Sequence, residues 1–409
     1  MITVFANASV FDGVCEDLLE GSHVVVEDGT IREVAASRPS FPDARIVECG
    51  GRFLMPGLID AHFHAYTPSF DFAGIDRMPP ALLASHAARI LEGALERGFT
   101  SVRDAGGGDI GLALAIEQGL IRGPRFFFAG KALSQTGGHG DVRRAEEVQP
   151  CGCCGYSGAL TRVVDGVEDM RKAVREELRK GAHQIKIFVS GGVLSPTDPL
   201  WMPQFTTEEI SAAVYEAATR RTYVMAHCHT DEGAARCVEC GVRTVEHGTM
   251  IHRDETARLI AARRAFVIPT LSIIDALQRH AEAAKIPRES VEKVKSLGDD
   301  AYRAIEVCRR NGVQLGLGTD LGGHAFHPLQ GGELELRGRV EKPIEVLRAA
   351  TSVNAEVLQK SGQLGRIAPD AWADILVVDS NPLRDLGLFR DPRRIPVVMK
   401  GGQFVRNAL

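Results

Sequence analysis

The chain has 409 residues, 44% of them hydrophobic and 25% charged. This is the composition of an ordinary globular protein with room for one barrel-sized domain and a smaller one. The formal net charge of −5 gives no reason to expect nucleic acid or an anionic membrane as a partner. No apolar run approaches 18 residues, so no membrane-spanning helix is expected.

The chain begins with MITVFANASVFDG, which has neither a charged start nor a cleavage site. We therefore expect no secretory signal and a cytoplasmic protein. The nine cysteines are an odd count, and reduced thiols are the simpler interpretation in that compartment. The CGCCG stretch at 151–155 could hold a structural zinc ion, although four well-spaced ligands are missing.

Both ends of the chain predict short β-strands, because apolar runs or alternating patterns lie between Asp-Gly and Gly-Gly turns. These patterns lie at 2–11, 22–35, 44–57, 373–383 and 395–406. We expect residues 1–57 and 363–409 to pair into one small β-sandwich domain, with the middle of the chain as an insertion.

The middle of the chain, residues 58–362, alternates apolar strand patterns with helical patterns such as those at 79–98 and 167–182. The eight expected strands lie at 57–64, 100–106, 125–133, 184–191, 222–229, 243–248, 265–272 and 313–320. This alternation predicts an α/β fold of the (β/α)8 TIM-barrel type, whose active site lies at the carboxyl ends of the strands. The segment 137–158 lacks periodicity and predicts a long loop over the barrel mouth.

The first barrel strand ends in His62-Phe-His64. Residues two apart in a strand point the same way, so both imidazoles can face one point. Imidazole is the most common transition-metal ligand. Two solvated histidines would be the ordinary alternative, but further candidate ligands follow at the ends of later strands.

Lys186 lies on the fourth strand, between Ile185 and Ile187, and is expected to point into the barrel. A bare ammonium is costly to bury and cannot bind a metal. It becomes a ligand after losing its proton and adding CO2, because the resulting carbamate has two oxygens that can bridge two cations. The alternative is a lysine that pairs with an acid or reaches the barrel mouth.

Three more candidate ligands end later strands: His227 the fifth, His247 the sixth and Asp320 the eighth. Any one of them could be an ordinary buried residue. Four histidines, a lysine and an aspartate fall in the required places on strands one, four, five, six and eight, and together they predict a metal site at the barrel mouth.

These residues, with MPGLIDAH before the first strand and the stretch around Asp374 near the end, resemble the amidohydrolase superfamily over nearly the whole chain. LSQTGGHGD, QIKIFVSGGVLSPTDP and GVRTVEHG resemble the bacterial branch of metal-dependent Xaa-Pro dipeptidases (prolidases) and carboxypeptidases. The resemblance implies two divalent cations, most simply zinc. One would be held by His62, His64 and Asp320, the other by His227 and His247, with N6-carboxylated Lys186 as the bridge.

The same resemblance implies roles for His139, near the substrate carbonyl, and for Arg236, which would bind the substrate carboxylate. A loop histidine and a surface helix charge are the ordinary alternatives. His229 stands where the dipeptidase branch has a tyrosine, and either group can donate a hydrogen bond to an oxyanion. His324 and His327 in the last loop are a further departure, and their effect on specificity is open.

The expected reaction is hydrolysis of an amide whose leaving group is an amino acid, with Asp320 as general base and then acid. An Xaa-Pro dipeptide is the first expected substrate. The alternatives are N-acyl amino acids, mycotoxin-type aryl amides and a carboxypeptidase substrate. A catalytically inactive scaffold and single-metal ring hydrolysis fit less well, because all six ligands, including Lys186, are present. Barrels of this kind are often homo-oligomers, which is an expectation from the family alone.

Overall fold

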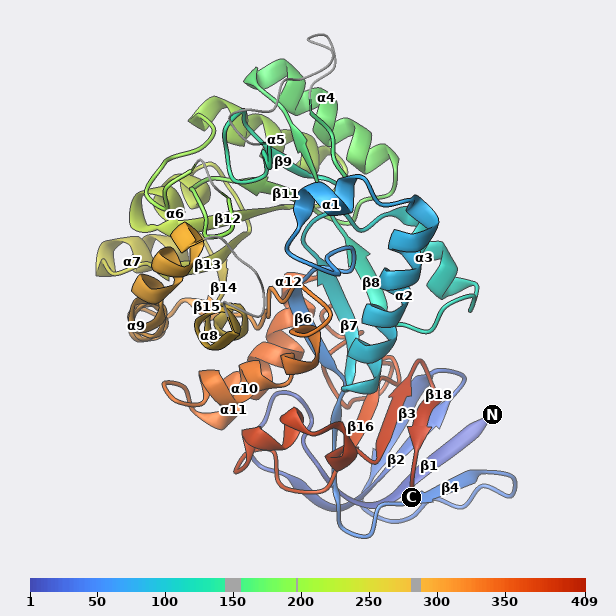
Figure 1. Cartoon of the computed structure of the whole chain (residues 1–409). Coiled ribbons are helices and arrows are strands. Elements are labelled where there is room, and N and C mark those ends of the chain that lie inside the picture. Colours follow the sequence, from blue (N-terminus) through green and yellow to red (C-terminus); the bar gives the residue numbers. More distant parts are fainter. Residues whose placement is uncertain (144–155, 196–197, 281–287) are drawn as a thin grey trace.

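The computed structural model describes residues 1–143, 156–195, 198–280 and 288–409. A mixed sheet built from both chain ends lies beside an α/β barrel formed by the middle of the chain (Figure 1). The expected α/β barrel with a small β domain is thus confirmed. Cys151, Cys153 and Cys154, the candidate structural zinc ligands, lie outside the described residues.

The β domain is one sheet of eight strands in which β1 pairs antiparallel with β2 and parallel with β4 and β5. Its strands are β1 (Ile2–Val10), β2 (Leu19–Glu27), β3 (Thr30–Ala35), β4 (Arg45–Glu48), β5 (Phe53–Pro56), β16 (Ile375–Val378), β17 (Val397–Lys400) and β18 (Gln403–Asn407). β16 pairs with β5, so the amino- and carboxyl-terminal parts of the chain share one sheet, as Figure 1 shows at the bottom of the view.

All eight expected barrel strands are present among the described residues. They are β6 (Leu58–Phe63), β7 (Phe99–Asp104), β8 (Arg125–Phe128), β11 (Ile185–Phe188), β12 (Val224–Thr230), β13 (Thr244–Met250), β14 (Phe266–Ile268) and β15 (Gln314–Leu315). Paired neighbours within the barrel are parallel. Backbone hydrogen bonds close the ring: Ala61 N donates to Leu317 O (2.8 Å), and His183 N donates to Phe128 O (2.8 Å).

The expected third strand, 125–133, is interrupted. It forms β8 and then β9 (Ala132–Ser134), which pairs with β11 and with β10 (Thr161–Val163). The break lies at Gly130, which has a positive φ of 70°. A Cβ there would meet Oε2 of Glu177 at 2.2 Å, so the turn needs glycine and the strand cannot continue through it.

Helices cover the outside of the barrel, and two predicted ones, 79–98 and 167–182, are α2 and α4. The helices are α1 (Phe72–Asp76), α2 (Pro80–Glu96), α3 (Ile110–Glu117), α4 (Gly166–Arg179), α5 (Thr207–Thr219), α6 (Asp231–Glu239), α7 (Asp254–Ala262), α8 (Leu271–His280), α9 (Arg288–Arg310), α10 (Gly332–Arg337), α11 (Pro343–Arg348) and α12 (Asn354–Val357).

The apolar stripe of α4 shows how these helices pack. Met170, Ala173, Val174 and Leu178 are buried, a spacing of three and four residues that places them on one face. They join one core with residues of β11 and α5. None of the described helices is long and apolar enough to cross a membrane.

Candidate metal centre

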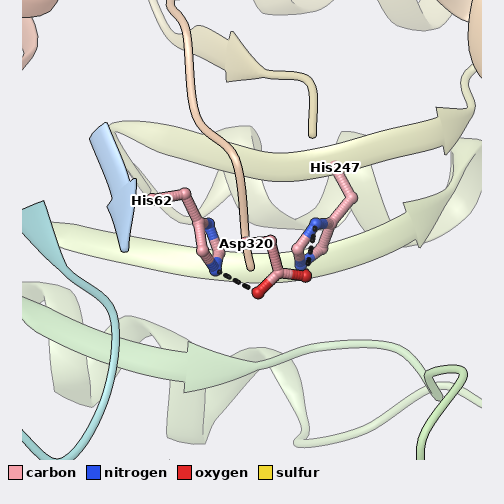
Figure 2. Close-up of side chains that lie close together, drawn as sticks. All are labelled: His62, His247 and Asp320. Carbon is pink, nitrogen blue, oxygen red and sulfur yellow. Dashed lines mark ion pairs between the residues drawn. The ribbon is translucent and has the colours of Figure 1, made fainter. Parts of the chain in front are cut away.

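Asp320 lies at the centre of a group of imidazoles at the barrel mouth. Its Oδ1 is 3.4 Å from His62 Nε2 and 3.0 Å from His64 Nε2, and its Oδ2 is 3.8 Å from His247 Nδ1. Ligand atoms of His62, His247 and Asp320 all lie within 4.8 Å of one another, and Figure 2 shows these three side chains pointing toward one another. The structure therefore brings four of the six expected ligands to one point.

Two of these residues reach the centre through an unusual backbone. His247 has a φ of 70° and Asp320 a φ of 55°, in the left-handed region that non-glycine residues rarely adopt. His247 directly follows Glu246, whose side chain also faces the centre. Alternation along a strand would send these neighbours to opposite faces, so the left-handed turn is what lets both point inward. Such strain clusters at functional sites.

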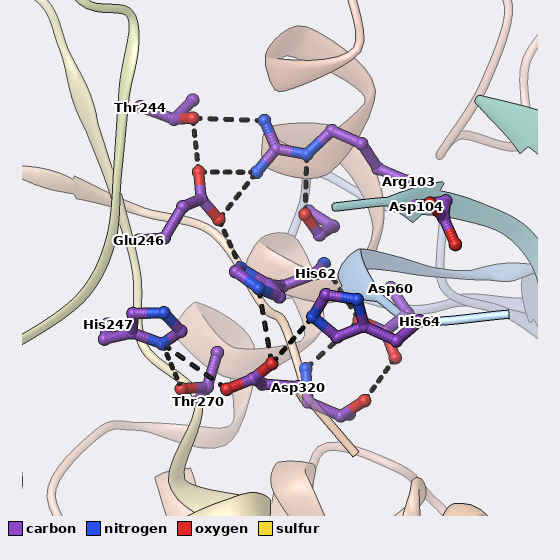
Figure 3. Close-up of polar contacts among 12 residues, drawn as sticks. Asp60, His62, His64, Arg103, Asp104, Thr244, Glu246, His247, Thr270 and Asp320 are labelled. Atoms are coloured by element: carbon purple, nitrogen blue, oxygen red, sulfur yellow. Dashed lines mark hydrogen bonds and ion pairs between the residues drawn. The ribbon is translucent and has the colours of Figure 1, made fainter. Parts of the chain in front are cut away.

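A buried ion pair lies behind His62 (Figure 3). Glu246 Oε2 is 2.7 Å from His62 Nδ1, and Arg103 Nη2 donates to both Glu246 oxygens at 2.8 and 2.9 Å. Arg103 also donates to Ala61 O and to Thr244 Oγ1. Although burial alone would raise the pKa of Glu246, Arg103 lowers it to about 2. The carboxylate therefore stays charged and orients His62 with Nε2 toward Asp320.

Asp60 ties the first barrel strand to the turn that carries Asp320. It accepts hydrogen bonds from the Thr319 hydroxyl (2.6 Å), Thr319 N (3.1 Å) and Gln330 Nε2 (2.9 Å), and from His62 N (3.1 Å). All four donors converge on one buried carboxylate. This single side chain thus positions ligands from both ends of the barrel domain.

Asp320 is held in its charged form. Burial alone would raise the pKa of this carboxyl, but His62 and His64 hold it well below its usual range. The pKa of His64 is raised because the hydrogen bond and charge of Asp320 outweigh burial. Burial lowers the pKa of His227 and His247 well below the usual histidine value, which keeps both imidazoles neutral as metal ligands require.

Lys186 is 2% exposed and lines the same cavity as the four histidines and Asp320. Burial lowers its pKa to about 8, against the opposing charges of Glu246 and Asp320. No hydrogen bond to its Nζ is found among the described residues. His227, the last of the six, lies edge-on to His247 with ring centroids 4.7 Å apart, and its Nε2 is 3.1 Å from Gly191 O.

His139 and His229 also reach this cavity. The ring of His139 stacks on His227 at 4.4 Å, and its Nδ1 lies 2.8 Å from Ser195 Oγ and 3.3 Å from Asp198 Oδ2. His229 Nδ1 lies 2.7 Å from Thr249 Oγ1. In both residues the Nδ1 atom has a protein partner, which leaves Nε2 as the nitrogen available to a substrate.

Arg236 does not reach the cavity. Its Nη2 donates to Val189 O (3.1 Å) and Gln204 O (3.0 Å), and it is not among the described lining residues. The expected contact with a substrate carboxylate therefore has no geometric support. The last-loop histidines are also elsewhere: His324 Nε2 is 2.7 Å from His86 Nδ1 at the surface, and His327 is buried against Phe63.

The donor set suits divalent transition metals. It consists of imidazoles and a carboxylate, which zinc, manganese and cobalt accept. Metal-binding histidines are commonly oriented by a carboxylate at their second ring nitrogen. In His62 that nitrogen is Nδ1, and its partner is Glu246. His64 Nδ1 is buried and has no hydrogen-bond partner within the described part of the chain. The sequence did not lead us to expect Glu246, Arg103 and Asp60 at the site. The only available signal was that Thr244 and Glu246 are two residues apart on β13, so their side chains share one face of the strand.

The family model for the amidohydrolase family matches residues 53–405. The chain belongs to the amidohydrolase family. The expected resemblance is therefore confirmed, and this amidohydrolase is a hydrolase of the class whose active site lies at the barrel mouth.

Relatives of this amidohydrolase include an ochratoxinase from Aspergillus niger, which is 34% identical over 376 residues that cover 86% of this chain and 75% of the relative. Two similar solved structures each match over 100% of this chain and 100% of their own chain. A prolidase complexed with N-methylphosphonate-L-proline is 46% identical with a TM-score of 0.95. A Xaa-Pro dipeptidase with bound methionine in its active site is 27% identical with a TM-score of 0.89.

Proposed function

We propose that this amidohydrolase uses two divalent metal ions, zinc in the first instance, to hydrolyse an amide bond whose leaving group is an amino acid, as in an Xaa-Pro dipeptide. The observation that carries the proposal is the convergence of His62, His247 and Asp320 within 4.8 Å. His64, His227 and Lys186 line the same cavity. The similarity to a prolidase and to a Xaa-Pro dipeptidase supports a dipeptide substrate that ends in proline.

His62, His64 and Asp320 would hold one cation, and His227 and His247 the other. Lys186 Nζ, after losing a proton and forming a bond to the carbon of CO2, would present two carbamate oxygens to both. Its burial beside these ligands supports this role, because an unmodified ammonium there is costly. Bound divalent cations supply a water of lowered pKa and polarise a carbonyl oxygen.

Asp320 is the proposed general base and acid. As a carboxylate it would take the proton from the attacking water and give it to the leaving amide nitrogen. The neighbouring imidazoles of His62 and His64 hold it ionised, which is the form that can accept the proton. His139 and His229, whose Nδ1 atoms have protein partners, would donate hydrogen bonds from Nε2 to the substrate carbonyl oxygen as negative charge develops.

A second candidate is the hydrolysis of an N-acyl amino acid or an aryl amide. The 34% identity to an ochratoxinase supports it. His229, in place of the expected tyrosine, alters the reach of a donor beside the reacting carbonyl, so the acyl specificity of dipeptidases need not hold here. A cytoplasmic location and a homo-oligomeric state stay predictions from the sequence.

Lys186→Ala tests the proposal. The variant is expected to lose most of its bound metal and its release of L-proline from Xaa-Pro dipeptides, and acetate is expected to restore part of both by replacing the carbamate. The readouts are metal content by elemental analysis and proline release. Lys172→Ala, on the exposed side of α4, is the matched control. Full metal content and full activity in Lys186→Ala would contradict the bridging role.

A further inference from the structure

One wall of the active-site cavity is apolar and continuous. Ile273, Ile274 and Leu277 of α8 line it together with Val294 and Leu297 of α9. These five side chains belong to a single buried core cluster, against which Phe70 packs from the loop after β6. Phe70 lines the cavity as well. None of these six side chains has a polar atom, so this wall of the cavity offers a hydrocarbon surface.

This wall begins directly beside the metal centre. Thr270 Oγ1 is 2.8 Å from His247 Nδ1, and Ile273 follows three residues later. The first turn of α8 is fixed from outside, since Glu333 of α10 accepts hydrogen bonds from Leu271 N (3.1 Å) and Ser272 N (2.6 Å). A substrate group that extends from the reacting carbonyl along α8 thus meets a pre-formed surface, which costs little ordering on binding.

The cavity is also larger than a small dipeptide needs. Its volume is about 840 Å³, toward the upper end of the range for pockets that hold drug-sized ligands. The charged carboxylate of the leaving amino acid is costly to desolvate against hydrocarbon. The apolar wall therefore suits the acyl half of the substrate and not its carboxylate.

We infer that α8, α9 and Phe70 form an acyl subsite for a bulky apolar group. The group is either the side chain of an apolar Xaa residue or an alkanoyl or aromatic N-acyl group. The inference rests on the proposed function, because it places the acyl half relative to the same reacting carbonyl. Ile273 and Leu277 are the residues that set the depth of the subsite.

The experiment measures kcat/KM of the metal-loaded enzyme for two substrate series. One series is N-acetyl-, N-butanoyl-, N-hexanoyl- and N-octanoyl-L-proline, and the other is Gly-Pro, Ala-Pro, Leu-Pro and Phe-Pro. We expect kcat/KM to rise with acyl size, by up to about fourfold for each methylene buried. A rise in only one series identifies the source of the apolar group.

Ile273→Trp fills the subsite and is expected to lower the octanoyl-to-acetyl ratio of kcat/KM by at least tenfold. Ile110→Trp, the same change at an exposed position of α3, is the control and should leave the ratio unchanged. Phe70→Asp is a second variant outside the packed helices, expected to lower the ratio in the same direction. Thermal melts establish that each variant is folded.

Each outcome decides one of the two proposals. Hydrolysis with kcat/KM independent of acyl size overturns the acyl subsite while the proposed function stands. If no compound is cleaved, the proposed function fails, and calorimetric titration with the N-acyl series then tests the subsite alone. An affinity that does not rise with the length of the acyl chain overturns the acyl subsite.

Discussion

At the scale of single residues, the centre depends on where the strand backbone stops being extended. His247, within β13, and Asp320, in the segment after β15, have φ values of 70° and 55° and turn their side chains toward His62. The strain of a left-handed non-glycine residue costs on the order of 1–3 kcal/mol. The surrounding contacts, such as that of Thr319 with Asp60, hold the backbone in place.

Asp320→Asn tests the proton-transfer role. The amide retains an oxygen ligand but cannot accept the proton, so kcat is expected to fall by about 10²–10⁴-fold at saturating metal, with metal content close to that of the wild type. Steady-state kinetics with parallel elemental analysis check this. Asp299→Asn, at an exposed position of α9, serves as the control. A fully active, metal-loaded Asp320→Asn enzyme would refute the role.

Glu246→Gln tests the buried pair behind His62. The change leaves Arg103 charged, buried and without its ionic partner, which is expected to destabilise the fold by about 3–5 kcal/mol. It also replaces the charged acceptor of His62 Nδ1 by a neutral amide, which weakens the hydrogen bond that orients His62, so metal affinity should fall by about 10–100-fold. Denaturant unfolding and metal titration measure the two effects.

The control for this pair is Glu92→Gln. Glu92 bonds to Arg122 at 2.9 Å on the surface, where both side chains are exposed and such pairs contribute about 0–1 kcal/mol. Equal losses of stability in the two variants would show that burial of the Glu246 pair has no special effect.

The candidate ligands could be predicted from the sequence because each stands within or at the end of an apolar strand pattern. Glu246 and Arg103 could not, since a charged residue within a strand pattern does not show which buried partner neutralises it. Asp60 has the same difficulty: its partners Thr319 and Gln330 lie 259 and 270 residues away. Arg236 was expected to bind the substrate carboxylate, and its position in a helix alone does not show that the backbone carbonyls of Val189 and Gln204 accept from its guanidinium.

At the scale of elements, the strands were predictable and their interruptions were not. Apolar runs indicated all eight barrel strands. The split between β8 and β9 lies at Gly130, whose φ of 70° ends the extended backbone, and the apolar pattern of the segment does not encode this turn. After the short eighth strand, the Asn354 side chain accepts from Leu317 N and donates to Leu317 O, a contact with a distant residue that the local pattern also does not encode.

Glu333→Gln tests the attachment of α8 to the centre. Glu333 is fully buried and accepts from Leu271 N and Ser272 N. An amide keeps one acceptor but places an NH2 group against a backbone N–H, which is expected to cost about 1–3 kcal/mol of unfolding free energy. Glu335→Gln, on the same helix but at the surface, should change it by no more than about 0.5 kcal/mol. Urea unfolding measures both, and equal changes would contradict the role of Glu333.

At the scale of the whole molecule, the two ends of the chain meet in one sheet, and β16 pairs with β5 directly before the first barrel strand. The carboxyl-terminal strands thus support the start of β6, which carries His62 at its end. The contact Gly57 N to Asp374 O (2.8 Å) continues this link. The sequence indicated such pairing only through similar strand patterns at the two ends, because the residues of a strand do not determine which other strand it pairs with.

Removal of metal should therefore lower the stability of the whole chain. Ligands from β6, β11, β12 and β13 and from the segments after β6 and β15 would share the same cations. A ligand present at a thousand times its Kd stabilises the native state by about 4 kcal/mol. An unfolding entropy of about 2.1 cal/mol/K per residue over 409 residues converts this to a fall in Tm of about 5 °C. Calorimetry of the enzyme before and after chelation measures it, and restoring zinc should reverse the change. An unchanged Tm after verified loss of metal would show that the ligands hold their places through protein contacts alone.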